Sequence, residues 1–356
     1  MYKSSYNVLG VMSGTSLDGV DIANLSFSNT GKWYWQILEA ETIPYSNDWL
    51  VKLKNAVNFS ESEIYQLNID YTHYLADLIN NFISTNKLKN IDAICSHGHT
   101  VLHKPHLGIT LQIGNLPIIS NLTHHKVVCD FRVQDINLGG QGAPLVPIGD
   151  RMLFYNYDYC INLGGFSNIS FEDDFERVAF DISPVNTVLN YFAQQLGYEY
   201  DDKGIIAKSG NFNRSLFDNL NAIDYYQKKF PKSLGVEFVN ERILTSIRSF
   251  QISIPDILNT FSEHIAFQIS KVITDKKATL LFTGGGVYNE YLMNRVKYFL
   301  PNSTIIIPNS KTIQYKEALI FGFLGVLKLR NEINVLSSVT GASHDHTSGK
   351  VFNFNS

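Results

Sequence analysis

The chain has few cysteines, no long hydrophobic run and no block of basic residues. Its three cysteines, Cys95, Cys129 and Cys160, lie far apart without a C-x-x-C pair, so neither a disulfide framework nor a zinc knot is indicated. No apolar run approaches the roughly 20 residues of a membrane span, and the N-terminal segment lacks the apolar region of a signal peptide. We therefore expect a soluble protein of a reducing cytoplasm, with no membrane partner.

The balance of charge excludes a second class of partner. The sequence has 29 Lys and Arg against 33 Asp and Glu, a net charge of -4, and no basic cluster of the kind that binds nucleic acid. Its 44% hydrophobic and 17% charged residues are typical of a globular protein. Because single hydrophobic cores stop growing at roughly 250 to 300 residues, the 356 residues are long enough for two cores.

Residues 8–21 are predicted to form a hairpin with a glycine-rich turn. An apolar run ends at Ser13-Gly14-Thr15-Ser16, and Asp18-Gly19 leads into residues 20–27, which alternate like a half-buried strand. Successive N–H groups and hydroxyls in such a turn form a concavity that binds anions such as phosphate. An ordinary hairpin turn uses the same residue types, but the density of hydroxyls and acids favours phosphate. The turn lacks the Lys and the helix of a Walker loop.

Three histidines follow a short buried strand predicted over residues 91–96. His97, His99 and His103 lie in a segment that we expect to be a loop. A metal site is one interpretation, but no cysteine or carboxylate lies nearby in sequence to complete it. Because open α/β sheets bind ligands at the carboxyl ends of their strands, a loop that faces the substrate is favoured.

Arg132 lies between Asp130 and Asp135, just before the glycine-rich residues 139–144. Two interpretations stay open for it. It forms a structural ion pair with these acids, or it donates hydrogen bonds to a hydroxyl, carboxylate or phosphate in a glycine-lined cleft.

The order of elements in residues 8–43 occurs again in the second half of the chain. Residues 159–163 form an apolar run, Gly164-Gly165 forms a turn, and residues 166–171 and 177–182 form two further strands. The two copies share few identical residues, so we interpret the repeat as architectural, with chance as the alternative.

A second glycine-rich segment lies near the end of this half. Gly284-Gly285-Gly286 follows a predicted buried strand, and Asn289 opens the next helix. Three glycines at a strand-to-helix junction permit close contact with a flat ligand or a phosphate.

The remaining elements complete two α/β halves. Ser60 and Glu63 form a capping box at the start of a long helix. The other expected strands cover residues 32–43, 278–282 and 305–307, and the expected helices cover residues 46–57, 60–87, 184–197, 253–273 and 315–330. We expect residues 338–356, with His344 and His346, to be a polar tail on the surface.

The chain has two halves, and each begins with a β meander that contains a glycine turn and ends in a strand and a helix. This organisation resembles the actin, Hsp70 and sugar-kinase superfamily, in which ATP binds between the halves. The resemblance extends to one family. The segments GVMSGTSLDGVD, SHGHTVLHKP, TLQIGN, DFRVQDINLGGQGAPLVP, NLGGFSNIS, PKSLG, TGGGVYN, EAL and SVTGAS, in this order over residues 7 to 343, are similar to those of the anhydro-N-acetylmuramic acid kinases. That family converts 1,6-anhydro-N-acetylmuramic acid, ATP and water into N-acetylmuramic acid 6-phosphate and ADP, and so recycles cell-wall sugar in the bacterial cytoplasm.

The resemblance implies an α/β fold of two actin-like (ribonuclease H-like) domains, with mixed sheets flanked by helices and the active site in the cleft between them. We expect the first domain over residues 1–150 and the second over residues 151–356, with the last helix free to pack on the first. ATP and Mg²⁺ are the implied cofactors, and a small amino sugar is the implied substrate. A homodimer is compatible with the family.

The functional positions are carried over where the motifs match. The turn from Gly14 to Asp21 matches the loop that binds the ATP phosphates, Asp18 or Asp21 would hold Mg²⁺ through water, and Asp181 matches the family's presumed catalytic base. The positions implied for the nucleotide are Gly14, Thr15, Ser16, Leu17, Asp18, Gly19, Val20, Asp21, Gly164, Gly165, Gly284, Gly285, Gly286 and Asn289. The positions implied for the substrate are His97, His99, Arg132 and Glu317.

The chain departs from the family around this site. The family's DTGPGN segment reads DISPVN here from Asp181 onward, which keeps the aspartate, the proline and the asparagine. A capping or turn role ahead of Pro184 is the alternative for Asp181. The departing positions are Ile182, Ser183, Val185, Asn190 (usually Asp) and His99 (usually Gln). They bear on the fine contacts of the pocket more than on the chemistry.

The implied reaction consumes water, because the anhydro bridge leaves no free 6-hydroxyl to phosphorylate. Asp181 would accept a proton from a water that attacks C1 while O6 takes the γ-phosphoryl group, with inversion at C1. Three other functions stay open: a kinase for another anhydro sugar such as levoglucosan, an ordinary kinase for N-acetylmuramic acid, and an actin-like or chaperone-like ATPase switch. The segments HGHTVLH and GGQGAPLVP speak against the switch.

Overall fold

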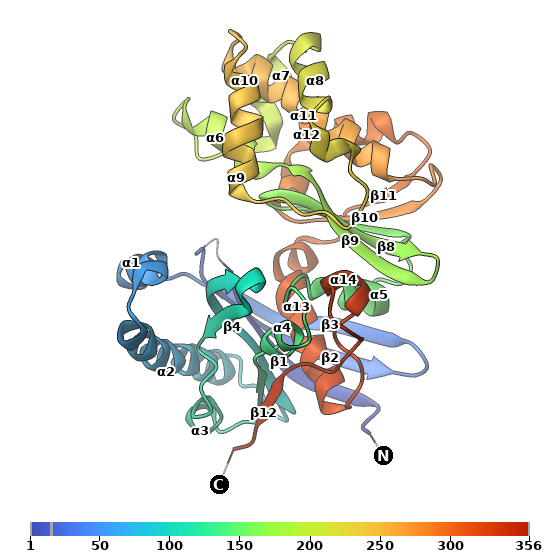
Figure 1. The fold of residues 1–356 in the computed structure, drawn as a ribbon. Helices are drawn as coiled ribbons and strands as arrows, with labels where there is room; N and C mark the ends of the chain where they lie inside the picture. The colour runs from blue at the N-terminus through green and yellow to red at the C-terminus, as the bar shows by residue number, and fades with distance from the viewer. Residues whose placement is uncertain (1, 15–16, 355–356) are drawn as a thin grey trace. The chain divides into compact units, whose positions relative to one another are not determined.

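The computed structural model describes residues 2–14 and 17–354, which divide into two compact units (Figure 1). The first unit comprises Met1–Leu153 and Gln314–Ser356, and the second comprises Phe154–Ile313. The range expected for the second domain, residues 151–356, therefore includes a long C-terminal segment that packs in the first unit. Thr15 and Ser16, two positions of the predicted phosphate turn, lie outside the described residues.

The first unit is built on a mixed sheet. In the described part of the chain it has seven strands in the order β12-β6-β4-β1-β2-β3, with β5 beside β4. Strands β1, β2 and β3 form an antiparallel meander, whereas β4 and β6 continue the sheet in parallel with β1. The strands are β1 Ser5–Ser13, β2 Val20–Asn29, β3 Trp33–Ile43, β4 Ala93–Lys104, β5 Ile109–Ile113, β6 Val127–Cys129 and β12 Lys350–Phe352. The helices are α1 Asn47–Asn55, α2 Glu61–Thr85, α3 Ile119–Thr123, α4 Val133–Asn137, α5 Val146–Leu153, α13 Ser310–Leu329 and α14 Ser337–Thr340.

Helix α2 begins at the predicted capping box. The Glu63 carboxylate accepts the Ser60 N–H at 2.8 Å, and the Ser60 hydroxyl accepts the Glu63 N–H at 3.4 Å, so two N–H groups of the first turn are satisfied. The buried side chains of α2 recur at helical spacing and share one hydrophobic core with β1, β2 and β4. These side chains are Leu67, Tyr71, Leu75, Ala76, Ile79 and Phe82.

Helix α13 packs on the other face of the same sheet (Figure 1). The ring of Phe323 lies edge-on to Trp33 of β3, with 5.1 Å between the centroids. A buried ion pair between Lys316 and Asp150, 2.7 Å long, joins α13 to α5. The backbone leaves helical values at Tyr315 (φ -109°, ψ 18°), beside the point where the chain passes from the second unit to the first.

The sheet of the second unit repeats the order of five strands of the first sheet, β6-β4-β1-β2-β3. Its described residues form a five-stranded sheet, β11-β10-β7-β8-β9, in which β7, β8 and β9 form a meander and β10 and β11 run parallel to β7. Leu163 pairs with Ser167 across the Gly164-Gly165 turn, just as Ser13 pairs with Val20 across the first turn. The predicted architectural repeat is confirmed.

The elements of this unit follow the predicted order, with several additional short helices between β9 and α11. The strands are β7 Tyr159–Leu163, β8 Phe166–Asp173, β9 Glu176–Pro184, β10 Thr279–Thr283 and β11 Thr304–Ile306. The helices are α6 Asn186–Gln194, α7 Ile205–Ser209, α8 Arg214–Asn221, α9 Val236–Phe238, α10 Thr245–Arg248, α11 Ile254–Val272 and α12 Glu290–Phe299.

Two predicted boundaries near the site are wrong. The expected histidine loop is the second half of β4, because β5 pairs with it as a hairpin and supplies its hydrogen-bond partners. The helix expected from Pro184 begins at Asn186, because Pro184 still pairs with Phe166 in the sheet.

The expectation of a surface tail over residues 338–356 is wrong for part of the segment, although His344 is exposed as expected. Within it, β12 pairs antiparallel with β6 and His346 is only 5% exposed. A polar composition suggested exposure, but these polar groups hydrogen-bond to each other and to the sheet, which allows them to be buried.

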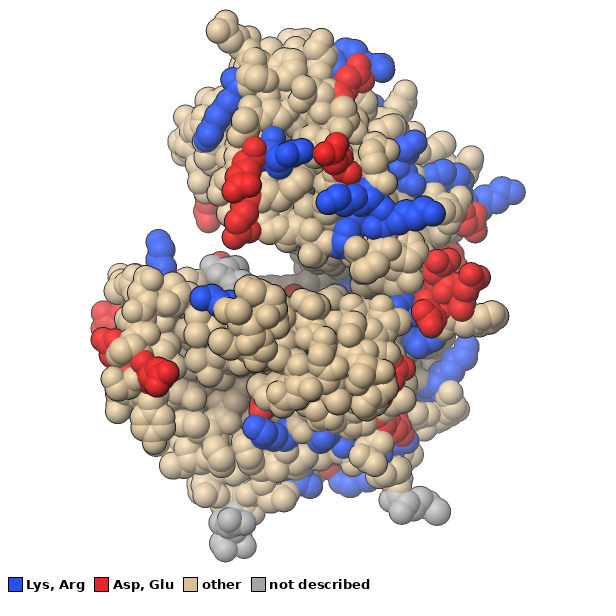
Figure 2. Space-filling view, in the orientation of Figure 1, with Lys and Arg blue, Asp and Glu red and all other residues tan. Residues whose placement is uncertain are grey.

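No helix among the described residues is long and apolar enough to cross a membrane. On the face shown in Figure 2, Lys and Arg side chains of the described residues are interspersed with Asp and Glu, with wide uncharged areas between them.

Candidate active site

The first predicted phosphate turn joins β1 to β2. The Leu17 N–H donates to Gly14 O at 3.3 Å, and Leu17 has left-handed backbone angles (φ 63°). At Gly19 a Cβ would lie 2.4 Å from the carbonyl oxygen of Ile43, so only glycine allows the turn to pack on the end of β3. The turn is therefore held close to the sheet by its glycine.

Two carboxylates lie at the end of this turn. Burial raises the pKa of Asp21, its hydrogen bond from the Thr42 hydroxyl (2.6 Å) lowers the pKa, and the negative Asp18 raises it again. Among the described residues, no group of three or more His, Cys, Asp and Glu is arranged to hold a metal ion. Carboxylates and water are the ligands that Mg²⁺ takes, so the side chains of Asp18 and Asp21 are chemically suited to such an ion.

Arg132 is hydrogen-bonded to His97 of strand β4. Arg132 Nε donates to His97 Nε2 at 2.9 Å, so the ring proton lies on Nδ1, which donates to Gly98 O at 2.8 Å. Burial and the positive charge of Arg132 hold the pKa of His97 well below its ordinary value. His97 is therefore a neutral acceptor that orients the guanidinium.

The acids that flank Arg132 in sequence bond elsewhere. Asp130 pairs with Lys350 at 2.7 Å, and the Asp135 carboxylate accepts hydrogen bonds from a backbone N–H and a hydroxyl. Arg132 Nη1 donates to Gly142 O at 2.7 Å. Burial lowers the pKa of Arg132 to about 10, which still leaves it charged at neutral pH. Of the two interpretations, these contacts favour a donor to a ligand, since three of the five guanidinium N–H groups take no part in the two bonds described.

Glu317 of α13 lies within electrostatic reach of this group. Burial by the surrounding protein raises the pKa of its carboxyl group, Arg132 lowers it, and Asp21 raises it. The Glu317 side chain is nevertheless exposed at the surface of the unit, although many protein atoms lie around it. In the first unit, Asp21 and Arg132 are therefore close enough to shift the pKa of Glu317, and Arg132 also shifts the pKa of His97.

His99 belongs to a chain of buried polar side chains. Its Nδ1 lies 2.8 Å from Ser13 Oγ, which lies 2.6 Å from Tyr45 OH, and Tyr45 OH lies 2.5 Å from Tyr71 OH. Ser13 directly precedes Gly14, so these hydrogen-bonded side chains connect β4 and α2 to the start of the turn between β1 and β2. With only 3% of its surface exposed, His99 is suited to positioning this turn.

The unfolding free energy of the first unit should fall as the pH decreases from 6.5 to 4. Burial lowers the pKa of His99 from 6.5 to about 4, so in this window the unfolded chain binds a proton that the folded chain does not, which costs up to about 3 kcal/mol. His99→Gln should remove its part of this dependence and leave the part that comes from His97, whose pKa is also lowered by burial. Urea unfolding followed by tryptophan fluorescence measures it, because Trp33, Trp35 and Trp49 all lie in the first unit.

His73, exposed on α2, provides the matched control for this measurement. His73→Gln should leave the pH dependence as in the parent protein. If the unfolding free energy of His99→Gln falls between pH 6.5 and 4 as steeply as that of the parent protein, the His99 ring is not a source of this pH dependence.

The two glycine segments of the second unit lie together. A Cβ on Gly284 would lie 2.7 Å from Leu163 O, and a Cβ on Gly286 would lie 2.8 Å from Leu163 Cβ, so both glycines pack on the end of β7. Gly285 has no other described atom within 4 Å of its ideal Cβ position. The backbone at Gly285 is therefore open to a ligand beside the second hairpin turn.

The second turn and Asn289 are each held by hydrogen bonds from N–H groups at or next to the N-terminus of a helix, α6 for the turn and α12 for Asn289. Gly165 O accepts the N–H groups of Val185 (2.8 Å) and Thr187 (3.2 Å), which holds the turn against the start of α6. Asn289 Oδ1 accepts the Leu292 N–H at 2.9 Å and caps α12, as its predicted place before that helix indicated.

Asp181 lies in strand β9 and is not a helix cap. Its Oδ2 accepts the Leu234 N–H at 2.8 Å, while its backbone carbonyl accepts the Tyr225 hydroxyl at 2.5 Å. Burial raises the pKa of Asp181, and the bond from Leu234 offsets part of this. Among the described residues, no donor is hydrogen-bonded to Oδ1. A carboxylate with one oxygen fixed and a raised pKa is suited to accept a proton.

Sequence reasoning named Ser13 and Asp135 but missed that Tyr45, His99 and Thr340 are the partners that hold them in place. Ser13 has partners 32 and 86 positions away, and Asp135 has a partner 205 positions away. The one available signal was the position of Ser13 directly before a glycine turn. Such long-range pairs depend on how the strands are assembled.

Two α/β units that share the order of five strands, each with a glycine turn between its first two strands, define the actin-like fold class to which sugar kinases belong. Residues 6–354 match the family described as anhydro-N-acetylmuramic acid kinase, and the chain belongs to that family. A relative of this name from Mannheimia succiniciproducens is 33% identical, with 99% of this chain and 100% of that one covered. Another, from Haemophilus influenzae, is 32% identical, with 97% of each covered. The solved activator of 2-hydroxyisocaproyl-CoA dehydratase from Clostridium difficile with bound ADPNP is also similar (TM-score 0.43, 12% identity, 91% and 97% covered).

Proposed function

We propose that this protein is a hydrolytic kinase of the cytoplasm that converts 1,6-anhydro-N-acetylmuramic acid, ATP and water into N-acetylmuramic acid 6-phosphate and ADP. The observation that carries this proposal is family membership over residues 6–354. The contacts of Asp181 and Arg132 and the electrostatic interaction of Glu317 with Arg132 support it, because these residues supply the groups that such a reaction needs.

Asp181 is the proposed general base. Its Oδ1 accepts a proton from a water whose oxygen attacks C1 of the sugar. The C1–O6 bond breaks, O6 takes the γ-phosphoryl group, and ADP leaves. Leu234, by its bond to Oδ2, fixes the orientation of the carboxylate. Burial, which raises the pKa of Asp181, makes it a stronger base than an exposed aspartate.

Arg132 is the proposed contact for the lactyl carboxylate of the sugar. Its charged fork is oriented by His97 and by Gly142 O, so a carboxylate meets donors that are already positioned. Glu317 is a candidate acceptor for sugar hydroxyls. An anhydro sugar without the lactyl group, such as levoglucosan, would lose the contact with Arg132.

The glycine turns are the proposed nucleotide contacts. The turn after β1 would face the ATP phosphates with backbone N–H groups, and the open backbone at Gly285 would lie near the adenosine. Asp18 and Asp21 would hold Mg²⁺ through water. When bound, Mg²⁺ neutralises charge on the phosphates.

The test is the product formed from each of three sugars with MgATP, measured by mass spectrometry. We expect a phosphorylated, ring-opened product from 1,6-anhydro-N-acetylmuramic acid and much slower turnover of levoglucosan and of N-acetylmuramic acid. Faster phosphorylation of N-acetylmuramic acid would indicate an ordinary sugar kinase. ADP release without a phosphorylated sugar would indicate an ATPase.

A further inference from the structure

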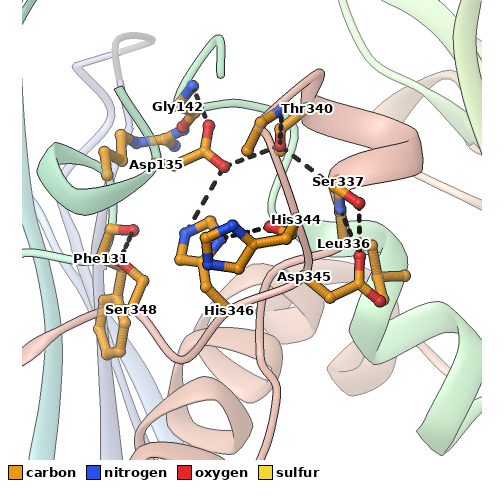
Figure 3. A network of polar contacts seen from close by, with 12 residues as sticks. Phe131, Asp135, Gly142, Leu336, Ser337, Thr340, His344, Asp345, His346 and Ser348 are labelled. Carbon is orange, nitrogen blue, oxygen red and sulfur yellow. Dashed lines mark hydrogen bonds and ion pairs between the residues drawn. The ribbon is translucent and has the colours of Figure 1, made fainter. Parts of the chain in front are cut away.

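The C-terminal segment reaches the glycine-rich loop through the carboxylate of Asp135. Figure 3 shows this buried group between the loop and the segment. Thr340 Oγ1 donates to Asp135 Oδ1 at 2.7 Å, and the Gly142 N–H donates to Oδ2 at 2.6 Å. His346 Nε2 lies 3.6 Å from Oδ1, and Asp135 has no exposed surface. A buried carboxylate needs such donors, because an unsatisfied charge is costly.

The loop is fitted closely around this carboxylate. A Cβ on Gly140 would lie 2.2 Å from Asp135 Oδ2, and the Gly140 N–H donates to Asp135 O at 2.9 Å. The Gln141 N–H donates to Thr340 O at 2.8 Å. The loop conformation is therefore set by Asp135 and Thr340 together.

The C-terminal segment is itself anchored to the sheet. The Ser348 hydroxyl donates to Phe131 O at 2.6 Å, and the Asn334 side chain exchanges hydrogen bonds with the Ser348 backbone at 2.7 and 3.0 Å. Strand β12 follows directly and pairs with β6. The segment is therefore a fixed support for the loop.

Gly142 connects this support to the candidate site. Its N–H donates to Asp135, and its carbonyl oxygen accepts Arg132 Nη1 at 2.7 Å. Arg132 in turn donates to His97. A shift of the loop would move the acceptor that orients the guanidinium.

We propose that Thr340 is a positioning residue for the sugar, which acts through Asp135 and Gly142 on Arg132. This rests on the proposed function, in which Arg132 contacts the sugar carboxylate. We expect Thr340 to affect KM for the sugar and not KM for the nucleotide, because the contacts that lead from it pass only through Asp135, the loop, Arg132 and His97. The hydroxyl of Thr340 is the part that matters, since it is the donor to Asp135.

The test compares Thr340→Val, Thr340→Ser and Thr347→Val. We expect Thr340→Val to raise KM for the anhydro sugar about tenfold, as expected for loss of one hydrogen bond to a charged group, with KM for ATP and kcat within about threefold. Thr340→Ser keeps the hydroxyl and should restore the parent KM. Thr347 is the matched control in the same segment, because its hydroxyl donates to Glu332 O. Thr347→Val should leave KM for the sugar unchanged.

Hydrogen–deuterium exchange provides a readout that does not depend on turnover. Thr340→Val should speed exchange of the Gly140 and Gly142 amides about tenfold, whereas Thr347→Val should not. If the parent enzyme does not turn over the anhydro sugar, the proposed function fails, and the exchange still tests the support of the loop. Unchanged loop exchange in Thr340→Val, an equal rise of KM for sugar and ATP, or a Thr340→Ser variant as impaired as Thr340→Val would each overturn the proposal.

Discussion

Asp181→Asn should lower kcat about 10³-fold, in the range expected for loss of a general base. In the parent protein the Leu234 N–H donates to Asp181 Oδ2 at 2.8 Å. An asparagine side chain keeps an oxygen that can accept the same hydrogen bond, so the local structure should be retained. It has no carboxylate to take the proton of the attacking water. Steady-state kinetics with the anhydro sugar and MgATP measures the loss.

Nucleotide binding should be retained in this variant, since the glycine turns are untouched. Asp173 is the matched control, because it is an exposed aspartate at the end of the neighbouring strand β8. Asp173→Asn should keep the parent kcat. A kcat for Asp181→Asn within tenfold of the parent value would remove Asp181 from the role of base.

Gly10→Ala should lower the unfolding free energy of the first unit by about 3 kcal/mol or more, at the upper end for an overpacked core. A Cβ on Gly10 would lie 2.0 Å from the carbonyl oxygen of Ala318 in α13 and 2.8 Å from Leu25 Cδ1. The oxygen belongs to the helix backbone and cannot rotate away as a side chain would. Helix α13 would have to move off β1, and Glu317 is next to Ala318.

Tryptophan fluorescence in urea measures this effect in the first unit alone, and Trp33 contacts α13 directly through Phe323. Gly31 is the control, because the structure shows no atom within 4 Å of its Cβ position and its φ is 98°. Gly31→Ala should cost only about 1 kcal/mol, from backbone strain alone. Equal losses in the two variants would contradict the close packing of α13 on β1.

The repeated hairpins could be predicted because their signals are local. Alternating side chains and glycine pairs mark the turns after Ser13 and Leu163, and the capping box at Ser60 marks the start of α2. The superfamily resemblance adds the expectation of two domains with mixed sheets flanked by helices. Family motifs also placed Asp181 and Arg132, whose contacts in the structure are compatible with their proposed roles.

The errors arose where partners lie far apart in sequence. His346 was expected on the surface because its neighbours are polar, yet Asp135, 211 positions away, lies beside it in the buried network. The expected loop at His97 continues as a strand because β5 pairs with it. No local pattern contains such contacts, because burial of polar groups depends on partners that only the folded chain provides.

The central claim is that water opens the anhydro bridge as O6 is phosphorylated. The most direct test is turnover in ¹⁸O-labelled water, with mass spectrometry of the sugar phosphate and of any inorganic phosphate. Unlabelled N-acetylmuramic acid 6-phosphate, incubated with the enzyme in the same water, corrects for exchange at C1. The account predicts one label at C1 of the product and none in its phosphate group. Label in inorganic phosphate, or a product without label at C1, would contradict it.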